Sequence, residues 1–166
     1  WDCRNNRLAW RGLQADDFSA AAAGAVGCHG AGRVGLVLGS STASIGATED
    51  AYRLLDANGV FPPQPDNPAL HTLHSLTGFV QEALGLQGPA LTISTACSSS
   101  AKAFAAAERW MRLGLADAVV VGGVDSLCSS VLFGFHALQL VSPEPCRPFD
   151  VQRRGISVGE AAGFAL

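Results

Sequence analysis

Residues 89–102, PALTISTACSSSAK, decide the fold of this chain. The run 90–94 is short and apolar, which predicts a strand buried in a sheet. Small residues with one cysteine follow it, and 98–113 then has the composition of a long helix that ends at Gly114. A strand that turns directly into a helix is the unit from which parallel sheets are built.

Cys97 occupies the corner of this predicted turn. Ligands of open parallel sheets bind at the carboxyl ends of the strands, and the turn would raise the sulfur above that edge. A helix N-terminus favours an anion, so this position favours the nucleophilic thiolate. The backbone N–H of Cys97 would be free to face a developing oxyanion, as in the nucleophile elbow of hydrolases. The alternative is a cysteine that only packs in the core; the small neighbours favour the nucleophile.

The rest of the chain continues the alternation of strand and helix. Two more apolar runs predict strands: 33–39, which we expect to be buried on both faces, and 118–121, which we expect to stop at the two following glycines. A last strand begins in 159–166. Four segments are predicted to be helical, namely 7–30 (two pieces broken near residue 15), 48–57, 71–86 and 126–142, with proline-rich loops at 61–68 and 142–148. This alternation predicts one α/β unit with a mostly parallel central sheet and helices on both faces.

The composition excludes several classes of protein. With 48% hydrophobic and 15% charged residues, the chain is not intrinsically disordered. A net charge of −3 provides no basic surface for nucleic acid, and no apolar run reaches the roughly 18 residues of a membrane span. The five cysteines are scattered without a CxxC motif, which argues against zinc and favours the reducing cytoplasm.

His71 and His74 are three residues apart on a predicted helix and could share one face. No carboxylate or cysteine motif accompanies them, so a metal site is the weaker interpretation. Surface or pocket-lining histidines are the better one. No metal and no cofactor is expected.

Three stretches together resemble a known family. They are TACSSSAKAF at 95–104, VVVGGVDSL at 119–127 and CRPFDVQRRGISVGEAAGFAL at 146–166. In their residues and in their order along the chain, they are similar to the N-terminal half of a β-ketoacyl-acyl carrier protein synthase, the condensing enzyme of fatty-acid and polyketide synthesis. The resemblance covers residues 33–166. The motifs VDSLC and GFHALQL are particularly similar to those of synthases of aryl-polyene pigment pathways.

The resemblance implies a thiolase-like fold, in which two similar halves stack in alternating α and β layers. Residues 1–166 would be part of the N-terminal half, without the first strand and without the C-terminal half. In such synthases the strand before the cysteine, here 90–94, pairs with its twin across a dimer axis, which would account for the low charge. The implied partners are a second copy or a related subunit, and an acyl carrier protein with its acyl and malonyl thioesters.

The resemblance also implies a mechanism. Cys97 matches the acyl-accepting nucleophile, after which the family decarboxylates a malonyl-carrier thioester and the carbanion attacks the acyl-cysteine. The two histidines that promote decarboxylation belong to the C-terminal half. None of the four histidines here falls on a matching position, namely His29, His71, His74 and His136. The chain alone is therefore expected to be inactive in condensation.

Two further positions match the acyl pocket of the family. Phe135, in FGFHAL, matches an aromatic that lines this pocket, although core packing explains it equally well. Thr42 lies in the loop after the first predicted strand, near a position where the family often has a bulky aliphatic residue. A small polar residue there would leave a wider or more polar pocket.

Charged residues near the end of the chain favour a structural interpretation. Glu160, in GEAAG, is expected in close backbone packing and not in catalysis. Four others surround a proline corner and would form an ion-pair network, or else touch an acidic carrier protein: Arg147, Asp150, Arg153 and Arg154.

Two other functions remain open. One is a non-catalytic subunit that shapes a chain-length cavity in a heterodimer; such subunits of the related family lack the cysteine, so Cys97 argues against it. The other is a cysteine hydrolase, which would need a histidine and an acid after the cysteine. His136 has no clear carboxylate partner and is a poor candidate.

Overall fold

A four-stranded sheet forms the centre of the computed structural model, which describes residues 1–61 and 68–166. The strand order is β2–β1–β3–β4. The first three, β1 (Val34–Gly39), β2 (Ala90–Ile93) and β3 (Ala118–Asp125), are parallel. The last, β4 (Ala161–Ala165), runs antiparallel beside β3. The predicted mostly parallel sheet is therefore confirmed.

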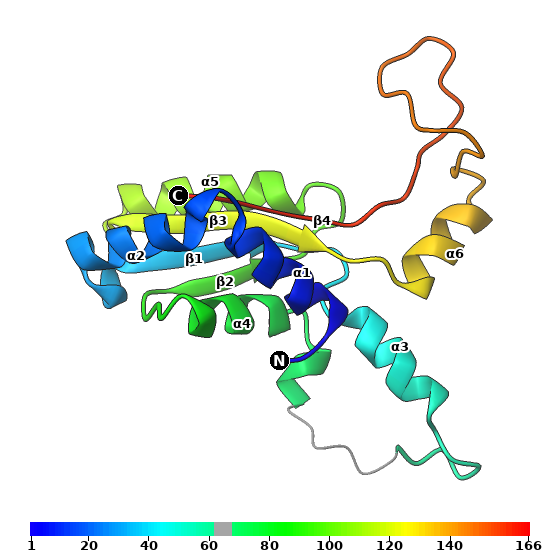
Figure 1. Cartoon of the computed structure of the whole chain (residues 1–166), viewed down its shortest axis with the longest axis horizontal. Coiled ribbons are helices and arrows are strands. Elements are labelled where there is room, and N and C mark those ends of the chain that lie inside the picture. Colours follow the sequence, from blue (N-terminus) through cyan, green and yellow to red (C-terminus); the bar gives the residue numbers. More distant parts are fainter. Residues whose placement is uncertain (62–67) are drawn as a thin grey trace.

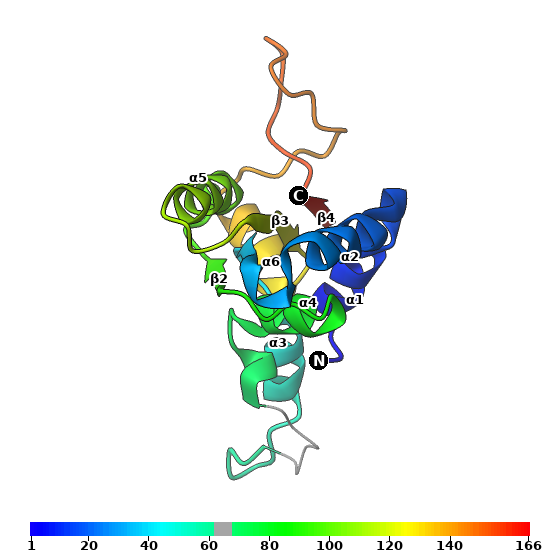
Figure 2. The same cartoon turned by 90° about the vertical axis from the view of Figure 1, so that its left-hand side faces the viewer.

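Helices cover both faces of this sheet (Figures 1 and 2). One face carries α5 (Ser99–Arg112). The opposite face carries three helices: α1 (Arg4–Leu13), α2 (Phe18–His29) and α4 (Ser75–Ala83). Two further helices, α3 (Ile45–Arg53) and α6 (Ser129–Ala137), extend beyond the carboxyl edge of the sheet.

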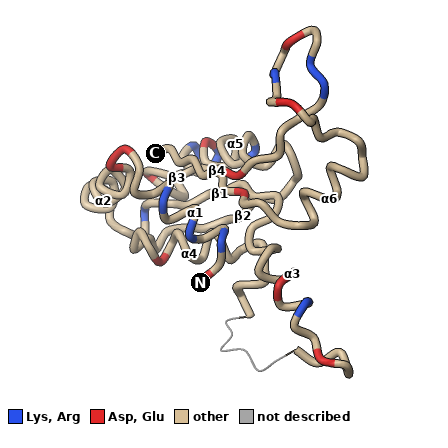
Figure 3. The backbone as a smooth tube through the Cα atoms, turned by 45° about the vertical axis from the view of Figure 1, so that its right-hand side comes forward, with Lys and Arg blue, Asp and Glu red and all other residues tan. Residues whose placement is uncertain are grey.

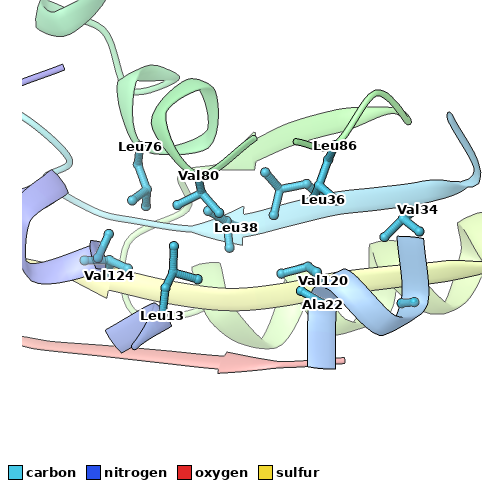
Figure 4. Close-up of a cluster of buried hydrophobic side chains, with 12 residues drawn as sticks. Leu13, Ala22, Val34, Leu36, Leu38, Leu76, Val80, Leu86, Val120 and Val124 are labelled. Carbon is cyan, nitrogen blue, oxygen red and sulfur yellow. The ribbon is translucent and has the colours of Figure 1, made fainter. Parts of the chain in front are cut away.

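The alternation of side chains along β1 produces two hydrophobic clusters. Leu36 and Leu38 point into the larger cluster with α1, α2 and α4 (Figure 4). Val37 points the other way, into the cluster beneath α5. All six residues of β1 are buried, which confirms the prediction of a strand buried on both faces and makes β1 the central element of the fold.

Two glycines bring the start of α5 close to the sheet. A Cβ added at Gly39, the last residue of β1, would lie 2.7 Å from backbone atoms of Ser99 and Ser100. A Cβ added at Gly123 of β3 would collide with the Ser100 hydroxyl. Because neither position has a side chain, the first turn of α5 rests directly on the carboxyl ends of β1 and β3.

Two strand predictions were wrong in detail. β3 does not stop before Gly122 and Gly123, because both glycines stay extended and pair with β1 on one side and β4 on the other. β2 is not a buried strand, since it lies at the sheet edge with Leu91 40% exposed. Both differences arise from the pairing of strands in the sheet, which the local sequence does not encode.

The boundaries of two helices differ from the predicted ones. α3 begins at Ile45 rather than Thr48, and it ends at Arg53 because the Asp56 carboxylate organises a turn by accepting from the Asn58 and Val60 N–H groups. In place of one helix over 71–86, a 3₁₀ turn at Pro68–His71 precedes α4.

The other predicted segments are present. The two pieces expected in 7–30 are α1 and α2, and the helix expected in 126–142 is α6. The proline-rich loop predicted at 61–68 lies outside the described residues except for its two ends. Within the described residues, no helix has both the length and the apolar character needed to cross a membrane.

Candidate active site

Cys97 lies in the turn between β2 and α5, two residues before the helix begins. The turn is tight because Ala96, directly before the cysteine, has a left-handed backbone with φ of 54°. Few side chains adopt this conformation without strain. The arrangement expected from the sequence, a strand followed by a cysteine and then a helix, is therefore present in a strained turn.

Hydroxyl groups hold this turn in place. The Thr95 N–H donates to Ser99 Oγ at 2.9 Å, and Ser99 Oγ donates to the Ala96 carbonyl at 2.6 Å. Ser98 Oγ donates to the Thr95 carbonyl at 2.9 Å. The sequence indicated only that these residues are small. The structure shows that the hydroxyls of the two serines after Cys97 bind backbone groups of the two residues before it.

The five cysteines occupy different environments, and all have free thiols. Cys3 and Cys128 are buried, and burial raises the pKa of both thiols, which disfavours the thiolate. Cys97 is exposed. The residue is therefore not part of the hydrophobic core, and a purely core-packing role does not describe it.

Asp125, the last residue of β3, fixes the loop that follows β1. Its Oδ1 accepts from the N–H groups of Ser41 at 2.7 Å and Thr42 at 2.9 Å. It also accepts from the hydroxyls of Ser40 and Thr42, both at 2.9 Å. One carboxylate oxygen thus connects the ends of two neighbouring strands. The sequence did not predict this role, because Asp125 and the hydroxyl-rich SSTAS at 40–44 come together only through the order of the strands.

The two predicted pocket residues lie at the same edge as Cys97. Thr42 is buried in the loop after β1, and its hydroxyl is engaged by Asp125. Phe135 is half-buried on α6, which follows β3. Since β1, β2 and β3 are parallel, the segments that carry Thr42, Cys97 and Phe135 all follow carboxyl ends of strands.

The histidines His71 and His74 do not share a helix face. His71 closes the 3₁₀ turn and pairs through Nδ1 with Thr48 Oγ1 at 3.0 Å. His74 precedes α4 and pairs with Thr92 Oγ1 at 3.2 Å. The two rings thus contact different elements, α3 and β2.

Glu160 has a structural role. It accepts from the Arg4 guanidinium at 2.6 and 2.7 Å and from the Leu127 N–H at 3.0 Å. The Arg4 contact, followed by the Leu127 contact, holds the pKa of the Glu160 carboxyl below its usual range. The residue therefore joins α1 to the segments that flank β3 and β4.

The arginine-rich loop 142–157 projects away from the sheet and carries charges of both signs (Figure 3). Arg147 and Glu144 are 3.8 Å apart, and the Arg153 guanidinium donates to the Asp150 carbonyl at 3.1 Å. A pocket of about 550 Å³ is lined by Glu144, Arg147, Gln152, Arg153 and Arg154. These contacts are local to the loop.

The chain is similar to known proteins in both sequence and structure. The family model described as "Beta-ketoacyl synthase, N-terminal domain" matches residues 8–166. Nodulation protein E of Rhizobium leguminosarum bv. trifolii is 34% identical over 135 residues, which cover 81% of this chain and 34% of that protein. The chloroplastic 3-oxoacyl-[acyl-carrier-protein] synthase I of Hordeum vulgare is 30% identical over 142 residues, 81% of this chain and 31% of that protein.

A solved structure is similar over almost the whole chain. It is the ketosynthase of Xenorhabdus doucetiae in complex with its chain length factor, with a TM-score of 0.79 and 32% identity. The match covers 98% of this chain and 41% of that one. The chain thus spans about a third of the length of the curated relatives that it matches.

Proposed function

Because this chain belongs to the β-ketoacyl synthase family and has its thiolase-like fold, we propose that it carries the acyl-accepting cysteine of a condensing enzyme of fatty-acid or polyketide synthesis. The observation that supports this most directly is the exposed Cys97 in a strained turn between a parallel strand and a helix. Helix N-termini stabilise thiolates and developing oxyanions.

The proposed reaction has two stages. The Cys97 thiolate attacks the carbonyl carbon of an acyl-carrier thioester, the new C–S bond forms, and the carrier thiolate leaves and takes up a proton. A malonyl-carrier thioester then loses CO₂, and the resulting carbanion attacks the acyl-cysteine carbonyl. The carbon–carbon bond forms as the Cys97 thiolate leaves. The N–H of Cys97 would donate to the oxyanion in both stages.

The acyl chain would lie along the carboxyl edge of the sheet. We propose that Thr42 and Phe135 contact it. Thr42 follows β1, which pairs with β2, and Phe135 lies on α6, which follows β3, the other neighbour of β1. An apolar wall suits an acyl chain, and α6 supplies exposed apolar side chains, with Leu132 42% and Phe133 72% exposed.

We further propose that residues 1–166 are part of the N-terminal half of the synthase. The support is the match to the N-terminal domain of the family and to about a third of the length of its relatives. The histidines that assist decarboxylation would then come from residues outside this chain.

The proposed partners are a second subunit and an acyl carrier protein. β2 lies at the sheet edge, where strand pairing with another subunit is available. Exposed apolar residues lie on it and beside it: Leu91 of β2 is 40% exposed and Phe104 of α5 is 52% exposed. A relative was solved with a chain length factor, so the second subunit is either another copy or a related chain. The five free cysteines are consistent with the proposed location in the cytoplasm. The aryl-polyene type stays a prediction from the sequence motifs.

Intact-mass spectrometry tests the proposal. The intact protein that carries this chain is incubated with an acyl-carrier thioester, and the site of acylation is mapped by peptide analysis. We expect a stable adduct on Cys97, none on Cys97→Ala, and an unchanged adduct on Cys28→Ala, which removes another exposed thiol. Rapid release of free acid would indicate the hydrolase instead, and absence of any adduct would indicate a non-catalytic subunit.

A further inference from the structure

Helix α6 is attached to the rest of the structure mainly through its N-terminal end. Its main packing partner among the described elements is α3. None of its residues, all of which the structure describes, is fully buried. Leu132, Phe133 and Leu138 are 42%, 72% and 68% exposed. Core packing therefore does not fix the position of α6, and its end contacts must do so.

Glu49 of α3 provides the principal end contact. Its Oε2 accepts from the Ser129 N–H at 2.8 Å, and its Oε1 accepts from the Ser130 N–H at 2.7 Å. Both donors belong to the first turn of α6, where backbone N–H groups have no partner within the helix. The carboxylate thus caps α6 from another helix, with both oxygens engaged, and its charge matches the positive end of the α6 dipole.

Arg53 strengthens the same contact. It lies one turn after Glu49 on α3, and its guanidinium donates to Ser129 Oγ at 2.8 Å. Two side chains of α3 therefore bind the first residue of α6 through different atoms. Near the start of α3, Gly46 faces Cys128, the residue directly before α6. A Cβ added at Gly46 would lie 3.6 Å from the Cys128 Cβ, which is an ordinary contact distance. Contacts along α3 thus define both the position and the direction of the start of α6.

The electrostatics agree with a permanent cap. Burial alone would raise the pKa of the Glu49 carboxyl, but the hydrogen bonds from Ser130 and Ser129 outweigh it and the pKa is lowered. The carboxylate is charged at neutral pH, when its cap on α6 is complete.

We propose that Glu49 is a positioning residue that orients α6 against the carboxyl edge of the sheet and thereby sets the length of acyl chain that the site accepts. This inference rests on the proposed function. A two-carbon acyl group ends close to the sulfur, whereas a ten-carbon chain needs an extended apolar wall. α6 carries exposed apolar side chains at this edge, so its orientation affects the long chain and not the short one.

The test compares acylation of Cys97 by two probes, acetyl-pantetheine and decanoyl-pantetheine, in the intact protein. The quantity measured is the ratio of their second-order rate constants, followed by intact mass. Glu49→Ala should lower the decanoyl-to-acetyl ratio about tenfold, a shift comparable to the loss of a helix cap. Glu49→Gln keeps acceptor capacity at one oxygen and should lower the ratio only about threefold.

Glu108→Gln is the matched control, because it removes a surface carboxylate of α5 whose partner is Arg112 on the same helix. We expect this variant to keep the wild-type ratio. If Glu49→Ala and Glu49→Gln both keep it, the inference is wrong while the proposed function stands. The inference is also wrong if Glu108→Gln lowers the ratio as far as Glu49→Ala.

Wild-type protein that acquires no acyl group at all contradicts the proposed function itself, and the inference fails with it. Should circular dichroism show Glu49→Ala to be unfolded, the Glu49→Gln ratio decides alone: a lowered ratio supports the inference and a wild-type ratio overturns it.

Discussion

Ala96 carries the backbone strain of the turn that presents Cys97. A left-handed alanine costs about 1 kcal/mol relative to an unstrained one, and a β-branched residue costs more. The structure tolerates this strain because the hydroxyls of Ser98 and Ser99 bind the surrounding carbonyls. Strained turns held by their surroundings are common at reactive sites.

The strain at Ala96 leads to a stability prediction. Ala96→Val should lower the free energy of unfolding by roughly 1–3 kcal/mol, because valine is poorly accommodated at a φ of 54°. Urea denaturation measures it. The same change at Ala101, an exposed position inside α5, should cost only the difference in helix propensity, about 0.5 kcal/mol. Equal losses at the two positions would show that the turn is not strained.

Asp125 allows a second prediction at the residue scale. Asp125→Ala leaves four donors of the 40–42 loop without their acceptor and should lower the free energy of unfolding by about 2–3 kcal/mol. Asp125→Asn retains an acceptor oxygen and should lose about half as much. Urea denaturation of both variants checks this, with Asp50→Ala as a surface control expected within about 0.5 kcal/mol of wild type. A ranking with Asn worse than Ala would contradict the role assigned to Oδ1.

At the scale of elements, the strands and helices predicted best from the sequence are those that depend on local composition. Residues 34–39 are apolar and bounded by polar or small residues, so a strand buried on both faces was readable. The end of β3 was not readable, because Gly122 and Gly123 stay in the strand only through their partners on β1 and β4. The start of α3 was likewise misplaced, since Glu49, which resembles a first-turn residue, caps α6 instead.

The same distinction applies to the candidate site. The placement of Cys97 in the turn between β2 and α5 was readable, because a lone cysteine between an apolar run and a helix is a local pattern. The roles of Asp125 and Glu49 were not, because each joins segments about 80 residues apart. Such contacts depend on the sheet order, which the local sequence does not contain.

The contact between α1 and Glu160 should make stability depend on pH. The folded pKa of Glu160 is lowered, first by Arg4 and then by the Leu127 N–H. A lowered folded pKa means that this stabilisation is complete above the unfolded value of about 4.3 and is lost as the pH falls through the folded value. The difference in free energy of unfolding between wild type and Glu160→Gln should therefore shrink as the pH falls from about 5 to about 3. Thermal denaturation across this range measures it; a constant difference would contradict the assignment.

At the scale of the whole molecule, exposed apolar side chains gather at several places, two of which lie beside the candidate site. One is the edge strand β2 with the outer side of α5, and the other is α6 with the loop that follows it, where Phe149 is fully exposed. Exposed apolar surface of this kind is typical of interfaces. The low charge content of 15% accords with such interfaces.

A substitution on the outer side of α5 tests the first of these surfaces. Phe104→Lys places a charge where we propose that a second subunit packs, and it should weaken association at least tenfold. Sedimentation velocity over a concentration series of the intact protein measures this. Leu54→Lys, which changes an equally exposed apolar residue at the end of α3, is the control and should leave association unchanged. Equal association of the Phe104 variant and wild type would place the interface elsewhere.

Gly39 and Gly123 lie directly under the first turn of α5, with no room for a methyl group at either position. Any larger residue there would lift the helix start and displace the nearby sulfur together with it. Attempts to redesign which molecules the proposed enzyme accepts should therefore keep these two positions as they are. Variation belongs in α6, where a change of shape can leave the proposed nucleophile in place.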